Sequence, residues 1–396
     1  MLMRRPLAYA LPLLGALTLG TRVSAHDVQV ASPVHLEKSS EERHLPDWFQ
    51  TLEMPNIPVR MEERVIDYLV YFHDDPRGKE RIRTWFERSQ MFEGTVRANL
   101  RAMQLPEDLL YVTMVESNSD PRVRSRKGAL GLWQFVRKTA SHFKLTRNRW
   151  VDTRIDPDLS TVAAGRYLNE LYQRYGTWEL ALAAYNMGPG ALTQAIRKYN
   201  TNDYAVLSQI EAGLPYETTY YVARIMACII VGHNRALFDI SDNASEENVS
   251  ARLEVPGGIY LRTIAQAANV PLQQLRQLNP GLLRLRTPPS EATWVVHIPH
   301  HALEPFENRW RGRYRVLETH ELTAIKNPVV SYESPRLQRR PKSRSATEAL
   351  FVAVPEKQFH YSDRIRVFHP VKAPIKAHDL ASRYGVLLKE LCAWNH

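Results

Sequence analysis

The chain has 396 residues, a net charge of +10 and a pI near 9.5, and 44% of its residues are hydrophobic. This length and apolar content are ordinary for a folded protein of two to three domains, which argues against a wholly disordered chain. The excess of positive charge predicts an acidic partner, and nucleic acid and the anionic cell wall are the two candidates. The only two cysteines, Cys228 and Cys392, fall in different expected domains, so a disulfide framework is not indicated.

The first 25 residues have the pattern of a secretory signal. Arg4 and Arg5 form a basic start, residues 7–20 form an apolar run, and residues 23–25 supply the small-x-small pattern that precedes cleavage. An uncleaved membrane anchor is the alternative, but the apolar run is shorter than the roughly 20 residues of a spanning helix. We therefore expect residues 1–25 to be a signal peptide and the chain to cross the inner membrane to the periplasm.

A polar, proline-punctuated stretch, residues 26–55, is expected to be a flexible lead. Apolar residues then recur at helical spacing over residues 59–72 and 78–103, with a turn predicted at residues 74–78. We interpret these two helices as a hairpin that buttresses a helical domain spanning residues 56–240.

Glu116 is the candidate catalytic residue. Pro106 suits the first turn of a helix, and Leu109, Val112 and Glu116 then recur on one face among further apolar residues. A helix that is apolar nearly all round is buried, so this carboxyl group should lose solvation. Desolvation raises the pKa of a carboxyl group and makes it a proton donor near neutral pH.

Four further motifs follow Glu116 in order. They are Ser125 nine residues later, Gly128–Phe135, Ala184–Gly188 and Pro215–Val222. This ordered set resembles the lytic transglycosylases of the soluble-lytic-transglycosylase superfamily, and within it the membrane-bound type D. The resemblance covers roughly residues 42–234. It implies a mainly α, lysozyme-like catalytic domain that acts on peptidoglycan without a cofactor or metal.

The resemblance also implies roles for individual residues. Glu116 would be the catalytic acid, whereas the other motif residues would bind the substrate (Ser125, Gln134, Tyr185 and Asn186) or support the cleft (Ser117, Glu217 and Tyr221). It implies that the Tyr185 hydroxyl points at Glu116, and that Ser125 hydrogen-bonds Glu116 or the N-acetyl group of the sugar. Ser125 as a loop cap, Tyr185 as a core aromatic residue and Asn186 as a helix cap are the structural alternatives.

Residues in and beside these motifs allow further expectations. Val136-Arg137 stands where the family has Met-Pro, which puts one apolar contact to the sugar in doubt. Trp133 and Phe135 are expected in the core. Further on, Asp156 should cap a helix that Gly176 ends.

The C-terminal part resembles LysM modules, small binders of N-acetylglucosamine chains. Residues 252–300 predict the order strand, helix, helix, strand. The segment Ile264–Asn279 aligns without a gap with Leu380–Asn395 and shares identical residues with it, so residues 359–396 are interpreted as an incomplete second copy. The basic, sequence-simple residues 301–358 between them predict a linker.

Other classes of site find less support. His297, His300 and His301 lack an accompanying metal-binding motif and are expected in a surface loop. No P-loop or convincing dinucleotide fingerprint is present, and the export signal argues against nucleic acid as the partner. No cysteine near the cleavage site supports a lipid anchor, which leaves peripheral membrane association open, and a monomer is expected.

The family reaction cleaves the β-1,4 bond between N-acetylmuramic acid and N-acetylglucosamine and leaves a 1,6-anhydromuramoyl end. The motifs offer no obvious second catalytic carboxyl group, because Asp120 is predicted in a turn and Glu217 supports the cleft. A goose-type hydrolytic lysozyme and a non-catalytic peptidoglycan-binding protein remain as alternatives.

Overall fold

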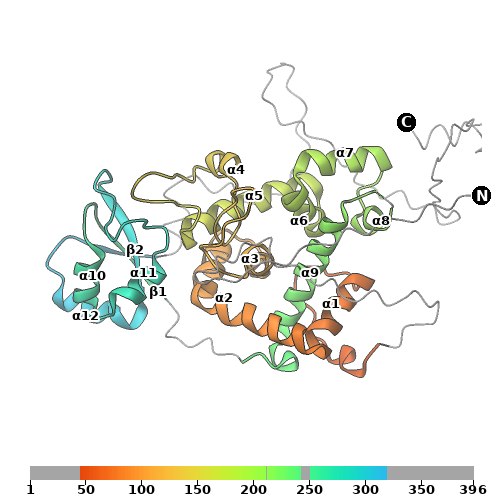
Figure 1. Ribbon diagram of the computed structural model, residues 1–396, viewed down its shortest axis with the longest axis horizontal. Coiled ribbons are helices and arrows are strands. Elements are labelled where there is room, and N and C mark those ends of the chain that lie inside the picture. The colour runs from red at the N-terminus through yellow and green to blue at the C-terminus, as the bar shows by residue number, and fades with distance from the viewer. Residues whose placement is uncertain (1–44, 211, 242–249, 319–396) are drawn as a thin grey trace, which may run out of the picture.

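The computed structural model describes residues 45–210, 212–241 and 250–318. The predicted signal peptide, most of the flexible lead, most of the linker, Cys392 and the second LysM-like copy lie outside these ranges. The described chain forms a helical unit, residues 45–241, and a smaller C-terminal unit, residues 250–318, which lie side by side (Figure 1). The prediction of a mainly α chain with a small α+β module is confirmed.

The helical unit is built from twelve described helices. In chain order they are η1 (Asp47–Thr51), α1 (Glu63–Asp74), α2 (Pro76–Ala102), η2 (Glu107–Tyr111), α3 (Val112–Ser117), α4 (Arg137–His142), α5 (Pro157–Tyr175), α6 (Trp178–Met187), α7 (Pro189–Tyr199), α8 (Tyr204–Gln209), α9 (Tyr216–His233) and η3 (Arg235–Phe238). None of the helices in the described part of the chain is long and apolar enough to span a membrane.

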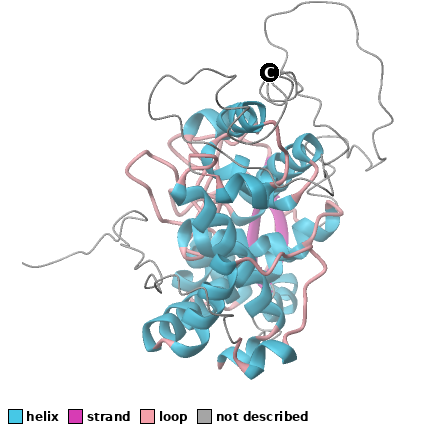
Figure 2. Cartoon of the chain, turned by 90° about the vertical axis from the view of Figure 1, so that its right-hand side faces the viewer, coloured by secondary structure: helices cyan, strands magenta, loops and turns pink. Residues whose placement is uncertain are grey.

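Helix α9 forms the centre of this unit. It is apolar on nearly every face, and Ile225, Ala227, Cys228 and Ile229 are fully buried. It packs against α1, α3 and α6, so its side chains reach the parts of the chain that carry the sequence motifs. In the turned view the strands of the C-terminal unit lie behind the helices (Figure 2).

Local sequence signals explain where several helices begin and end. The Asp156 side chain accepts a hydrogen bond from the backbone N–H of Leu159, and Gly176 ends α5 at a φ of 82°, as predicted. Asp75 caps α2 in the same way. The turn between α1 and α2 is shorter than predicted, because Gly78 already lies in α2. A Cβ atom there would come 1.8 Å from the Tyr71 carbonyl oxygen, so glycine allows the two helices to approach closely.

The C-terminal unit is a three-stranded antiparallel sheet covered by helices. Its elements are β1 (Ser250–Pro256), α10 (Leu261–Ala268), α11 (Leu272–Leu278), β2 (Thr293–Pro299), η5 (His300–Ala302), α12 (Leu303–Arg309) and β3 (Arg315–Leu317). The strand order is β2-β1-β3, with Ser250 opposite Pro299. Asn279 joins α11 to β2, because its side chain bonds both the N–H and the C=O of His297. The predicted start of the linker at residue 301 is wrong, since α12 and β3 follow β2 and complete the unit.

A buried carboxylate joins the two units. Asp158 of α5 accepts hydrogen bonds from Arg252 of β1 at 2.8 and 2.9 Å and lies 2.9 Å from His297 Nε2 of β2. Asn99 of α2 donates to the same carboxylate at 2.6 Å. The prediction of a surface loop for His297 is wrong, because this side chain is 4% exposed and lies at the contact between the units.

The partners of Asp158 keep its buried carboxyl group ionised. Burial by itself would raise the pKa of this carboxyl group, but His297 and Arg252 together hold it well below the ordinary value. A carboxylate with a lowered pKa stabilises the fold at pH values above its unfolded pKa of about 3.9, and this stabilisation is lost as the pH falls below that value.

We expect Asp158→Asn to lower the free energy of unfolding by about 3–5 kcal/mol, because it removes the charged acceptor of two hydrogen bonds from the buried Arg252. The measurement is denaturant unfolding at pH 7. The exposed pair Glu80–Arg83, with its N–O distance of 3.6 Å, supplies the control. Glu80→Gln should change stability by less than about 1 kcal/mol. Equal effects of the two substitutions would contradict the role of Asp158.

Candidate active site

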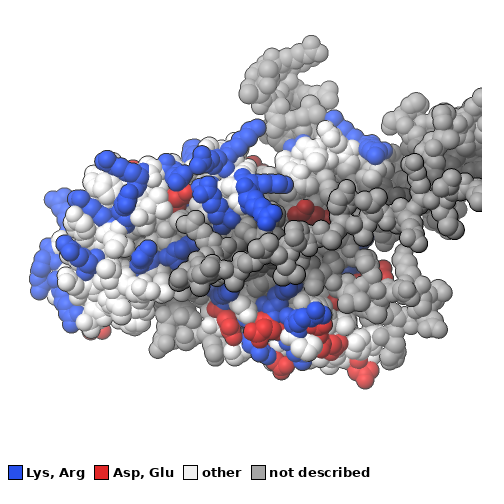
Figure 3. All heavy atoms as spheres, viewed as in Figure 1, with Lys and Arg blue, Asp and Glu red and all other residues white. Residues whose placement is uncertain are grey.

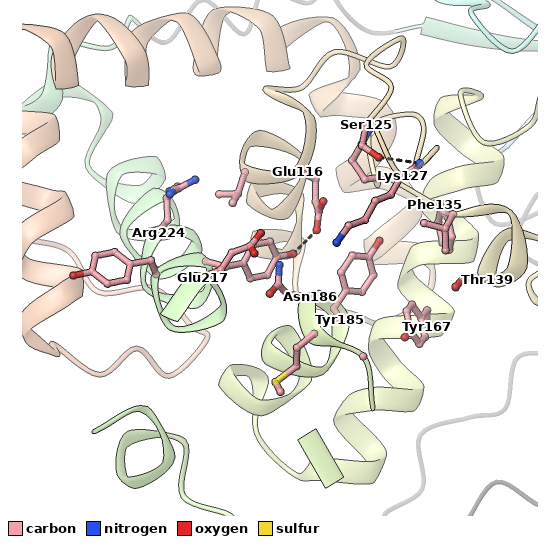
Figure 4. A pocket seen from close by; sticks show the side chains of 18 of the residues that line it. Glu116, Ser125, Lys127, Phe135, Thr139, Tyr167, Tyr185, Asn186, Glu217 and Arg224 are labelled. Carbon is pink, nitrogen blue, oxygen red and sulfur yellow. Dashed lines mark hydrogen bonds between the residues drawn. The ribbon is translucent and has the colours of Figure 1, made fainter. Parts of the chain in front are cut away.

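A cleft of about 750 Å³ lies on the helical unit. Its walls come from α1, α3, the segment after α3, α4, α5, α6 and α9. They include eight residues that bear on its chemistry: Glu116, Ser125, Lys127, Gln134, Tyr185, Asn186, Glu217 and Tyr221. Seven of these eight come from the sequence motifs. Helices far apart in the sequence therefore bring the motifs together around one cavity (Figure 4).

Glu116 occupies the last turn of α3, where the chain reverses direction. Asn118 and Ser119 follow at φ values of 52° and 57°, a left-handed conformation that ends the helix. The buried Ser117 hydroxyl lies 3.0 Å from the Leu132 carbonyl oxygen, to which it can donate, and so joins the end of α3 to the Gly128–Phe135 motif. The supporting role predicted for Ser117 therefore corresponds to a defined contact beside Glu116.

The Glu116 carboxyl group has one direct hydrogen-bond partner among the described residues. The Tyr221 hydroxyl of α9 donates to Glu116 Oε1 at 2.7 Å. Burial raises the pKa of Glu116 to about 7, the Tyr221 hydrogen bond opposes this rise, and the nearby negative charge of Glu217 adds to it. The desolvation argued from the apolar helix thus has its counterpart in the structure. A carboxyl group with this pKa can both donate and accept a proton near neutral pH.

Tyr185 and Ser125 each have a hydrogen-bond partner other than Glu116. The Tyr185 hydroxyl donates to the Trp133 carbonyl oxygen at 2.7 Å, and Ser125 Oγ accepts from the Ala129 N–H at 3.0 Å. Both nevertheless line the cleft with Glu116. Ser125 stabilises its own loop, as the structural alternative predicted. Burial, and then the nearby charge of Glu116, raise the pKa of the Tyr185 hydroxyl well above its ordinary value.

Gln134 has a structural role as well as a place in the cleft. Its backbone has a φ of 48°, and its side-chain Nε2 donates to the carbonyl oxygens of Val123 and Gly131. The amide nitrogen of Gln134 is therefore engaged with the loop. Glycine is required at position 131, because at its φ of 92° a Cβ atom would lie 2.0 Å from the Arg154 carbonyl oxygen.

The remaining motif residues lie on the wall formed by α6 and α9. Asn186 accepts a hydrogen bond from the Thr218 hydroxyl at 2.8 Å, which ties the end of α6 to the start of α9. Glu217, predicted to support the cleft, lines it together with Glu116 and is therefore a second carboxyl group in the cavity. Asp120, by contrast, caps the Arg122 N–H in a turn, as expected.

Two cations of the cleft were not identified from the sequence. Lys127 points its ammonium group into the space between Glu116 and Tyr185 (Figure 4). Arg224 lies on α9, two turns after Glu217, where it donates to the Tyr68 hydroxyl at 2.9 Å. Their closeness in sequence to motif residues could have indicated a place in the cleft, since Lys127 lies two residues after Ser125 and Arg224 lies three residues after Tyr221. Among the described residues, no group of three His, Cys, Asp or Glu side chains could hold a metal ion.

The raised pKa of Glu116 predicts a cost in stability. An unfolded glutamate has a pKa of about 4.3, so the folded state loses stability as the pH rises from about 4 to about 7. Glu116→Gln keeps an acceptor for Tyr221 and removes the charge. We expect it to raise the free energy of unfolding by about 1–3 kcal/mol at pH 8 and to have little effect at pH 4.

Thermal unfolding at both pH values tests this expectation. The exposed Glu87→Gln on α2 is the matched control and should show no such difference between the two pH values. A Glu116→Gln protein that is less stable than the wild type at pH 8 would show that the carboxylate is not destabilising in this site.

Comparisons with known proteins agree with this site. Residues 95–207 match the family "Transglycosylase SLT domain", and residues 250–311 match "Lytic transglycosylase MltD, LysM-like domain". The chain is therefore similar to this superfamily in both units, as the motifs indicated. The first match includes Glu116, Ser125, Gln134 and Tyr185, and the second begins at the first residue of β1.

Curated relatives give the same result. The chain is 23% identical over 325 residues to membrane-bound lytic murein transglycosylase D of Escherichia coli (strain K12). The matched region covers 81% of this chain and 63% of that protein. The chain is 31% identical over 126 residues to the soluble lytic murein transglycosylase of Salmonella typhimurium, covering 30% of this chain and 19% of that protein. Peptidoglycan transglycosylase gp16 of Escherichia phage T7 is 32% identical over 122 residues, covering 30% and 9%. The chain thus spans less than two thirds of each relative.

Proposed function

We propose that this chain, which carries a transglycosylase SLT domain followed by a LysM-like domain, is a peptidoglycan lytic transglycosylase. The observation that carries the proposal is Glu116, a carboxyl group with a pKa of about 7 at the centre of a 750 Å³ cleft. Ser125, Gln134, Tyr185 and Asn186 line the same cleft, which supports their proposed contacts with the sugar chain. We infer the substrate, peptidoglycan, from the names of the relatives.

The proposed reaction uses Glu116 twice. The protonated carboxyl group first donates its proton to the glycosidic oxygen, and the bond from muramoyl C1 to that oxygen breaks. The resulting carboxylate then takes the proton of the muramoyl C6 hydroxyl, whose oxygen bonds to C1 and closes a 1,6-anhydro ring. No water is consumed, and Glu116 ends protonated. The attacking hydroxyl belongs to the same sugar, so it has a high effective molarity compared with water.

Tyr221 is the proposed positioning residue for this proton transfer. Its hydroxyl fixes one carboxyl oxygen, Oε1, at 2.7 Å, which leaves the other oxygen to face the substrate. Because this hydrogen bond favours the ionised form of Glu116, it also keeps the pKa near neutrality against the effect of burial. The same geometry therefore allows one carboxyl group to act first as acid and then as base.

We expect Glu116→Gln to abolish lysis of purified sacculi, because an amide has no labile proton to donate. Tyr221→Phe should lower kcat by about 10- to 100-fold and raise the pKa on the alkaline limb of the pH–rate profile, since it removes a hydrogen bond that favours the carboxylate. Turbidity of sacculi against pH is the measurement. Lysis by Glu116→Gln at a rate close to that of the wild type would sink the assignment.

A hydrolytic lysozyme is the second candidate, and Glu217 is the observation that favours it. Two carboxyl groups in one cleft are what most glycosidases use, one as acid and one as base or nucleophile. In the proposed transglycosylase Glu217 instead acts on Glu116 through its charge, which raises the pKa of the acid. The two reactions differ in their products and in their dependence on Glu217.

Mass analysis of the released muropeptides separates these candidates. We expect products lighter by one water than hydrolysed ends, which resist borohydride reduction. Glu217→Gln should retain lysis and move the alkaline limb of the pH–rate profile to lower pH, because a neighbouring negative charge is lost. Mainly reducible muramic ends, together with an inactive Glu217→Gln, would establish the hydrolase instead.

The cellular setting follows from the same proposal. The enzyme would act in wall turnover and remodelling after export to the periplasm, with the C-terminal unit holding N-acetylglucosamine-containing chains. The proposed domains are the catalytic residues 56–240 and a binding module that begins near residue 252.

A further inference from the structure

Two segments of the chain are rich in basic residues and contain no acidic ones. Residues 121–150, between α3 and α5, hold nine Lys and Arg and no Asp or Glu, and most of these cations are exposed. Residues 257–290 of the C-terminal unit hold four Arg and again no acid. The Lys and Arg side chains of these two segments are called the basic face below. In Figure 3 Lys and Arg predominate over the C-terminal unit and the adjoining loops, whereas both signs of charge mix over α2.

The two segments adjoin, so the basic face is continuous. The Arg122 guanidinium donates to the Arg276 carbonyl oxygen at 3.4 Å, and the N–H of Leu283 donates to the Trp150 carbonyl oxygen at 2.8 Å. Behind this contact lies the buried pair of Asp158 and Arg252, which holds the two units together. A ligand would therefore meet one surface with fixed positions of charge.

The basic face also reaches the cleft. Lys127 belongs to it and points into the cavity beside Glu116, and Val136 and Thr139 of the same segment line the cavity wall. Arg137 and Lys138 follow Val136 in the first turn of α4. The positive end of the helix dipole disfavours cations there, so these charges do not serve the stability of the helix.

Several of these cations are available to a ligand. Among the described residues, no carboxylate pairs with Arg137, Lys138 or Arg284, whereas Arg147 is within 3.5 Å of Asp152. The nearby acid Asp152 is buried and pairs with Arg154 as well as with Arg147, so it offsets little of the charge of the face. The positive potential of these cations would attract an anionic ligand along the whole distance from the cleft to the C-terminal unit.

We propose that the basic face binds the stem-peptide carboxylates of a peptidoglycan strand that runs from the cleft to the C-terminal unit. The inference rests on the proposed function and deepens it, because it makes the peptide-bearing strand, and not the bare sugar chain, the ligand. In a peptide-bearing strand the lactyl carboxyl group of N-acetylmuramic acid forms the amide bond to the peptide and is uncharged, while each peptide supplies free carboxylates at intervals along the strand. A continuous face that begins inside the cleft fits such a spaced anion. An anionic membrane surface is the competing partner, because Leu283 and Leu285 are each 42% exposed beside Arg284.

Binding to sacculi in a Glu116→Gln background tests the proposal, since the probe then remains intact. The basic-face variant is Arg137→Gln, Lys138→Gln and Arg284→Gln combined, and the matched control is Arg88→Gln, Arg197→Gln and Lys198→Gln, which removes three exposed cations elsewhere. Each protein is titrated onto untreated sacculi, onto sacculi whose carboxyl groups have been amidated with carbodiimide and ethanolamine, and onto phosphatidylglycerol vesicles.

The parent should bind untreated sacculi with an affinity that falls as salt is added, and should bind amidated sacculi more weakly and without that salt dependence. The basic-face variant should bind untreated sacculi about tenfold more weakly than the parent, because three exposed ion pairs are lost, while the control variant matches the parent. Both variants should bind amidated sacculi equally. Circular dichroism of each variant reports the fold.

Three results would overturn the proposal: equal binding of the parent to untreated and amidated sacculi, equal losses in the two triple variants, or a loss confined to vesicles. The last would assign the face to a lipid surface. None of these depends on catalysis. Failure of the proposed function would show separately, as wild-type protein that binds sacculi but releases no muropeptides.

Discussion

The hydrogen bond from Tyr221 to Glu116 is the contact on which the site depends. It joins residues 105 positions apart, one at the end of the short α3 and the other in the central helix α9. The buried apolar residues of α9, among them Ile225 and Ile229, fix the position of this helix in the core, and Tyr221 lies on the same helix. The core thereby sets the orientation of Glu116, whose pKa burial raises to about 7, and this ties packing to the proposed chemistry.

Around this contact the motif residues divide into two kinds. Ser117, Ser125 and Gln134 hold the loop after α3 through backbone hydrogen bonds, and so shape the wall on one side of Glu116. Glu217 and Tyr221 act on the carboxyl group directly, through charge and hydrogen bonding. A motif residue can therefore be essential for the site without contacting the substrate, because the loop that it holds is part of the cleft.

The buried Asp158 plays the corresponding role between the units. Its partners Arg252 and His297 come from two strands of the C-terminal unit, so the carboxylate is satisfied only when that unit is in place. Such an arrangement makes the orientation of the two units part of the fold and not a property of a linker. Because these contacts set the orientation of the two units, the cleft and the C-terminal unit form the continuous path that the proposed extended ligand requires.

The sequence by itself determined the local features: the caps of α5 at Asp156 and Gly176, the apolar helix that buries Glu116, and the strand and two helices of the C-terminal unit. These depend on residues within about four positions of one another, so their pattern is visible along the chain. The tertiary structure alone decided that Tyr221 bonds Glu116, that Lys127 points into the cleft, and that His297 lies buried against Asp158. Those contacts join residues up to 139 positions apart or turn on the path of a loop, and helix packing, which no local spacing records, brings them together.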